Sequence, residues 1–202
     1  MKSLRLPAVA GLALMVGACG SASARGIVWN ESVNGDLSGD RFNPTNLTLH
    51  AGSNTLIATS GNATLPNGDR EYVHFTLPAG TSLVGLVNVS YVGTGDDTAF
   101  IAVQAGSTFT EPPTGTTVGN ILGYHHFGPN EGTIGLDILP DMGNAFAAIG
   151  FTPPLTGSNY TFWIQQVGSP CTYEFNFQVV PTPGTAGLVA AAGVVLLRSR
   201  RR

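Results

Sequence analysis

Residues Tyr160 to Val179 read YTFWIQQVGSPCTYEFNFQV and carry the clearest structural pattern in the chain. In the second half, apolar side chains alternate with polar ones: Tyr173, Phe175, Phe177 and Val179 against Thr172, Glu174, Asn176 and Gln178. A period of two is typical of a β-strand with one buried face. We therefore predict a strand over Thr172–Val179 with its aromatic face inward. Tyr160–Gln166 is predicted to be a second strand, paired with the first as an antiparallel hairpin through Val167–Cys171.

Similar patterns recur through the body of the chain. Glu71–Leu77 alternates, Leu83–Tyr91 is apolar on both faces and is predicted to be central in its sheet, and Thr98–Ala105 is predicted to be buried. Further strands are expected at 27–32, 47–49, 55–59 and 121–127, with 47–49 and 55–59 forming a hairpin. The 27 glycines and 13 prolines favour many turns. The predicted fold class is all-β: an antiparallel two-sheet sandwich, jelly-roll-like, flanked by an N-terminal signal peptide and a C-terminal short apolar helix.

The N-terminus has the layout of a secretory signal peptide over residues 1–24. Lys2 and Arg5 precede the apolar stretch Leu6–Gly17. An A-x-A cleavage site follows, formed by Ala22 and Ala24 around Ser23, and makes Arg25 the predicted start of the mature chain.

An alternative reading of the same end is a lipoprotein signal. Val16-Gly17-Ala18-Cys19 would then be the recognition box and Cys19 would carry the lipid. Cleavage after Ala24 instead removes Cys19 and leaves Cys171 as the remaining cysteine, which we expect to be a small, inert side chain.

The C-terminus, residues 181–202, has three parts in a fixed order. Pro181, Thr182 and Pro183 come first, the apolar run Ala186–Leu197 follows, and the basic end comprises Arg198, Arg200, Arg201 and Arg202. As a helix the apolar run would rise only about 18 Å, against a hydrocarbon core of about 30 Å. Arginine is costly to translocate and marks the cytoplasmic side. The tail is therefore predicted to insert into the membrane transiently rather than to anchor the protein permanently.

This tail resembles the PEP-CTERM sorting signal of bacteria that make exopolysaccharide. That signal consists of Pro-Glu-Pro, an apolar helix and an arginine cluster, and Thr182 stands here where the family usually has Glu. The resemblance implies processing by an exosortase-type membrane protease and association with exopolysaccharide. It also implies an exported protein, held briefly at the inner membrane and then located at the cell surface or outside the cell. A plain tail anchor is the alternative.

A second resemblance lies in residues Gly68–Thr81, GDREYVHFTLPAGT. This stretch is similar to a motif of the bacterial pre-peptidase C-terminal domain, with Gly-Asp, an acid, an aromatic residue, Phe and then Pro-Ala-Gly. The similarity extends loosely over Asp69–Val179 and implies a small, extracellular, non-catalytic β-sandwich. The β-sandwich domain as a whole is predicted to span residues 25–180.

The distribution of charge excludes several functions. The body carries all twelve acidic residues, only Arg25, Arg41 and Arg70 as basic residues, and no lysine. Such an acidic surface does not suit nucleic acid. Lysine bases are excluded, and the G-x-S-x-G, H-E-x-x-H and C-x-x-C patterns are absent from the sequence. We therefore expect a protein that is not an enzyme.

Two binding functions remain open in the sequence. Asp36, Asp40, Asp96 and Asp97 place hard oxygen ligands in loops, which suits calcium, while the alternative is that they cap turns. We expect no tightly held cofactor and at most a weak calcium site. The predicted function is a non-catalytic surface or extracellular-matrix protein. The alternative is a carbohydrate-binding module that stacks sugars on exposed aromatic residues, for which the candidates are Tyr72, Tyr124 and Trp163.

Overall fold

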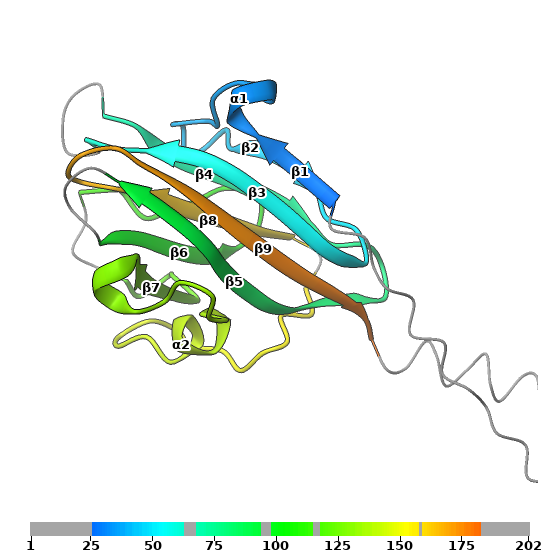
Figure 1. The fold of residues 1–202 in the computed structure, drawn as a ribbon. Coiled ribbons are helices and arrows are strands. Elements are labelled where there is room, and N and C mark those ends of the chain that lie inside the picture. The colour runs from blue at the N-terminus through cyan, green and yellow to red at the C-terminus, as the bar shows by residue number, and fades with distance from the viewer. Residues whose placement is uncertain (1–25, 63–67, 94–97, 115–117, 158, 183–202) are drawn as a thin grey trace, which may run out of the picture.

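The computed structural model describes residues 26–62, 68–93, 98–114, 118–157 and 159–182, which form two packed β-sheets (Figure 1). Its elements, in chain order, are β1 (Gly26–Asn30), α1 (Glu31–Asn34), β2 (Thr45–Thr48), β3 (Gly52–Ser60), β4 (Arg70–Thr76), β5 (Thr81–Gly93), β6 (Ala99–Ala105), β7 (Gly123–Phe127), the short 3-10 helix η1 (Pro129–Glu131), α2 (Leu139–Gly143), β8 (Asn159–Gln165) and β9 (Cys171–Pro181). The predicted signal peptide and C-terminal helix lie outside the described residues.

The all-β prediction is confirmed, but the sheets are mixed rather than purely antiparallel. One sheet has the order β1-β3-β9-β5 and the other β2-β4-β8-β6-β7. The outermost strands β1 and β2 run parallel to their neighbours β3 and β4, and the remaining pairs are antiparallel. The chain reaches both outer positions through loops, so no tight hairpin imposes an antiparallel direction there.

The two predicted hairpins are wrong, because the two strands of each predicted pair lie in different sheets. β9 lies between β3 and β5, whereas β8 lies between β4 and β6 in the other sheet. β2 and β3 are separated in the same way. The alternation of apolar and polar residues predicts which face of a strand is buried. It does not predict whether the next strand in the chain pairs with it in the same sheet or packs against it from the other sheet.

The core between the sheets is aromatic, as the alternation of β9 predicted. Phe175 and Phe177 are fully buried. The Phe177 ring centroid lies 4.4 Å from that of Phe75 on β4, and that of Phe175 lies 4.8 Å from that of Phe127 on β7. These contacts join the inner faces of opposite sheets, so burial of the β9 aromatic residues holds the sandwich closed.

The outer face of the second sheet carries a smaller apolar cluster. Tyr72 and Trp163 lie there and are covered by Phe109 and Ile121, which belong to the long connection between β6 and β7. Tyr72 is 1% and Trp163 6% exposed. Of the three aromatic candidates for sugar stacking, Tyr72 and Trp163 are therefore buried, while Tyr124 is half-buried.

β5 was predicted to be central, yet it is the last named strand of its sheet. Its outer edge is nevertheless hydrogen-bonded, because Leu83 exchanges two backbone bonds of 2.9 Å with Leu155 and Val87 bridges to Asp137. Connecting segments thus cover an edge that would otherwise expose unpaired backbone groups.

Candidate metal centre

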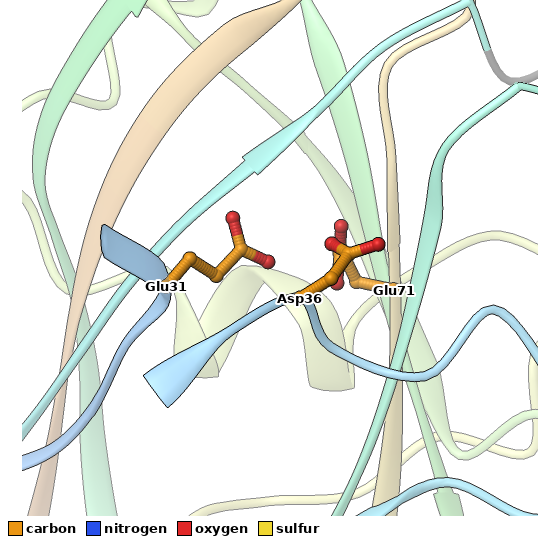
Figure 2. Close-up of side chains that lie close together, drawn as sticks. All are labelled: Glu31, Asp36 and Glu71. Carbon is orange, nitrogen blue, oxygen red and sulfur yellow. The ribbon is translucent and has the colours of Figure 1, made fainter. Parts of the chain in front are cut away.

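Three acidic side chains from two segments that are distant in sequence meet near one edge of the sandwich. They are Glu31 at the start of α1, Asp36 in the loop after α1, and Glu71 on β4. One carboxylate oxygen of each lies within 4.8 Å of one from each of the others. Figure 2 shows the Asp36 and Glu71 carboxylates next to each other and that of Glu31 facing them.

Local structure fixes the position of Glu31. The Asn30 side chain accepts a hydrogen bond of 3.1 Å from the Ser32 amide and so caps α1, which ends the predicted strand 27–32 early at Asn30. The Glu31 carboxylate accepts the amide of Leu37 at 3.2 Å and that of Thr59 at 2.6 Å. Glu31 therefore ties the loop after α1 to the end of β3.

The loop that carries Asp36 is held from both sides. Gly35 precedes it with a φ of 86°, a conformation that glycine adopts without strain. Leu37 is buried in the core, and the Tyr72 amide donates to the Ser38 carbonyl at 2.8 Å. Asp36 itself is exposed to solvent, so its side of the cluster is open to water.

Glu71 has the most unusual environment of the three residues. It shares its strand face with Val73 and Phe75 and is 0% exposed. Neither of its carboxylate oxygens has a hydrogen-bond partner among the described residues. A buried, unpartnered carboxylate is costly, because the charge loses its hydration without compensation.

Burial, followed by the nearby carboxylates of Asp69 and Glu31, raises the pKa of Glu71 to about 11. The Asp69 carboxyl also contacts that of Glu71, a contact that becomes a hydrogen bond only when one of the two holds a proton. Burial likewise raises the pKa of Glu31 to about 7, against the opposing effect of its two backbone hydrogen bonds. In the described part of the chain, no arginine or histidine contributes to these shifts.

A solvent hollow lies on the β3 side of Glu31, and neither Asp36 nor Glu71 is among the residues that line it. Its volume is about 330 Å³, and Glu31, Thr59 and Thr172 are among the residues that line it. On the interior side lies Tyr173, whose buried hydroxyl has no partner among the described residues. Burial, followed by the charges of Glu71 and Glu31, raises the pKa of Tyr173 well above its usual range. The interior side of the cluster, at Glu71 and Tyr173, is therefore buried and acidic.

The structure separates the residues predicted to bind metal. Asp36 belongs to the cluster, but Asp40 accepts the Phe42 amide at 2.9 Å and so caps a turn, as the alternative reading had it. Asp96 and Asp97 lie outside the described residues. Glu31 and Glu71 were not among the predicted metal ligands. Glu71 could have been identified from the sequence, because it is an acidic residue on the apolar face of a predicted strand.

The predicted sorting residues are only partly described. Pro181 ends β9, and the Thr182 amide donates to the Gly80 carbonyl at 2.8 Å. Pro183, the four terminal arginines (Arg198, Arg200, Arg201 and Arg202) and the cleavage-site residues Ala22 and Ala24 lie outside the described residues.

Cys171 at the start of β9 is a buried free thiol. Burial raises its pKa to about 11, partly offset by a hydrogen bond with Tyr91. A thiol in this state holds its proton at neutral pH and is a poor nucleophile. This environment agrees with the expectation of an inert side chain.

Comparison with protein-family models, curated proteins and solved structures gives no match to this chain. Within the described residues, no helix is both long and apolar enough to span a membrane. The function proposed below therefore rests on the chain's own residues.

Proposed function

We propose that this chain is an exported, non-catalytic protein of the cell surface or extracellular matrix, delivered by an exosortase-type sorting system. The observation that carries this proposal is the order of the tail: Pro181-Thr182-Pro183, the apolar run to Leu197, and the arginines from Arg198. The division into residues 1–24, 25–180 and 181–202 belongs to the same proposal. Exopolysaccharide is the proposed partner outside the cell.

The end of the folded body supports a processed tail. The β9 ladder pairs as far as Pro181, which faces Thr81. Proline lacks the amide proton that a longer ladder would need, so Pro183 would not extend the pairing. Pro181 and Thr182 are held against the closed body, because the Thr182 amide and hydroxyl both donate to the Gly80 carbonyl, so the proposed protease would act beyond them.

The two ends of the body also lie close together, which suits a protein whose two terminal signals are both processed at the same membrane. Gly26 on β1 pairs with Asn54 on β3, and Asn54 pairs with Phe177 on β9. Two strand spacings, about 10 Å, therefore separate the start of β1 from the last part of β9 (Figure 1). The acidic cluster lies beyond the other end of β1, so it would face away from a membrane that held the tail.

We further propose a jelly-roll arrangement for the body. The orders β3-β9-β5 and β4-β8-β6-β7 follow the interleaving of that architecture, and the segment at Asp137 runs beside β5 where another strand would complete its sheet. Such sandwiches serve as rigid, non-catalytic scaffolds as often as binding modules, so the architecture alone assigns no ligand.

Replacing Arg200, Arg201 and Arg202 together with serine should make an uncut form accumulate in a host that carries an exosortase. The change removes the charges that stop the apolar run at the cytoplasmic side, so the segment is no longer held for the protease. Immunoblotting of membrane and medium fractions measures the effect. The matched control replaces Arg41 and Arg70 in the body with serine and should leave processing unchanged. Normal release of the tail variant would contradict the sorting proposal.

A carbohydrate-binding module is the second candidate, and one feature favours it. A shallow hollow of about 250 Å³ is lined by Phe100, His126 and Gln165 among others, which combines aromatic faces with polar groups. Burial of Tyr72 and Trp163 removes the flat aromatic platform that this candidate first required. A sugar-array screen of the exported protein distinguishes the two: binding that is lost in Phe100→Ala supports the module.

A further inference from the structure

We propose that Glu31, Asp36 and Glu71 form a calcium site that fastens the N-terminal segment of the body to β3 and β4. Asp69, which contacts Glu71, lies beside the three and supplies further negative charge. The chemistry of this site does not depend on how the tail is processed.

The strongest evidence for a ligand is Glu71. Its side chain is completely buried, and the described residues offer its oxygens the acidic carboxyl of Asp69 rather than a basic or backbone donor. The Glu71 side chain is directed toward the other two carboxylates (Figure 2). Folded proteins pair or coordinate buried carboxylates, because leaving one bare costs several kcal/mol. A cation between the three carboxylates would satisfy Glu71 and offset the mutual repulsion of the group.

The spacing and chemistry of the oxygens favour calcium. Calcium binds oxygen at about 2.3–2.6 Å, so two ligands on opposite sides of the ion are roughly 5 Å apart. The three carboxylates, within 4.8 Å of one another, meet this condition before any movement. All three donors are hard oxygens, which disfavours zinc and copper. Magnesium requires a tighter, nearly ideal octahedron, whereas calcium accepts six to eight irregular ligands, with water from the exposed Asp36 side completing the shell.

The site is also held in shape before the ion arrives. The backbone amides of Leu37 and Thr59 orient the Glu31 carboxylate, and each of its oxygens keeps a further lone pair for a metal. The bridge between Ser38 and Tyr72 holds the Asp36 loop against β4. The exposed side chain of Asp36 leaves the site open to solvent. An ion bound here would join three segments of the chain, so it should stabilise the folded state.

The test is a calcium titration of the purified exported protein after treatment with a chelator and dialysis. We expect a dissociation constant of about 10⁻⁴ M, which is typical of extracellular calcium modules. The melting temperature should then rise by about 5 °C or more at 10 mM CaCl2. MgCl2 at the same ionic strength should give a much smaller shift. Isothermal titration calorimetry measures the same binding directly.

Two substitutions locate the site, each with a matched control. Glu71→Gln keeps the shape of a buried side chain but removes its charge, so the shift should disappear, whereas Glu174→Gln on β9 should keep it. Asp36→Asn changes an exposed residue that the fold does not need, and it should weaken binding at least tenfold, whereas Asp40→Asn should not. The comparison of Asp36→Asn with Asp40→Asn still tests the proposal if Glu71→Gln does not fold.

Three results would overturn the proposal. The first is no calorimetric binding at 10 mM calcium, and the second is an equal stabilisation by magnesium. The third is calcium binding of wild-type strength in Asp36→Asn and, if that variant folds, in Glu71→Gln as well.

Discussion

Replacing Phe177 with alanine should lower the free energy of unfolding by about 3–5 kcal/mol, the usual range for a buried phenylalanine. Phe177 is fully buried, and its ring lies 4.4 Å from Phe75 and 5.4 Å from Phe162, both on the opposite sheet. The truncation would leave a cavity between the two sheets where they pack most closely. Urea denaturation followed by far-UV circular dichroism measures the loss.

The control for this prediction is Val180→Ala, three residues further along the same strand. Val180 is 41% exposed, so its truncation should change the unfolding free energy by no more than about 0.5 kcal/mol. Equal effects of the two substitutions would mean that the aromatic face of β9 is not the centre of the core.

The second large effect concerns pH. In the metal-free protein, the pKa of Glu71 is raised from 4.5 to about 11 by burial and by neighbouring carboxylates. The stabilisation by its bound proton is complete below about pH 4.5 and is lost progressively as the pH rises toward the folded pKa. Between pH 5 and 8 the folded state holds a proton that the unfolded state lacks, so stability should fall as the pH rises. Glu31, with a pKa of about 7, steepens the fall in the lower part of this window.

Glu71→Gln isolates the contribution of this residue. In the presence of a chelator, the slope of unfolding free energy against pH should become less negative by one proton, about 1.4 kcal/mol per pH unit. Urea titrations at pH 5, 6, 7 and 8 measure the slope. Glu174→Gln serves as the control and should preserve the wild-type slope. An unchanged slope in Glu71→Gln would show that Glu71 is ionised in the folded protein at neutral pH.

The strands were predictable because most of them bury one face and expose the other. The predicted strands at 71–77, 98–105 and 121–127 correspond to β4, β6 and β7, and the aromatic face of β9 is buried as expected. Pairing was not predictable in the same way. β8 and β9 are adjacent in sequence and both apolar on one face, and that pattern fits a hairpin and a pair packed face to face equally well.

Burial of the second aromatic cluster could not be read from strand periodicity. Tyr72 and Trp163 lie on the face that alternation assigns to solvent, and they are covered by Phe109 from a connection without regular structure. The Arg41 carbonyl accepts the Phe109 amide at 2.8 Å and helps to hold this cover in place. Contacts of this kind depend on the tertiary path of a long loop, for which the sequence carries no periodic signal.

The acidic cluster was predictable only in part. Asp36 was selected because it lies in an acidic loop, and Glu71 was detectable as a charge on an inward-facing strand position. Glu31 was not detectable, because its role depends on the amide of Thr59 on another strand. Sites assembled from distant segments require the fold to be known first.

The central proposal is that the tail is a sorting signal that is removed by proteolysis. Intact mass spectrometry of the exported protein tests this proposal most directly. The protein should be isolated from the medium and surface of a host that carries an exosortase. We expect a mass that begins at Arg25 and lacks the arginines from Arg198 onward, with the new C-terminus near Pro181-Thr182-Pro183. A mass that includes Arg202 would mean a plain tail anchor and would contradict the sorting proposal.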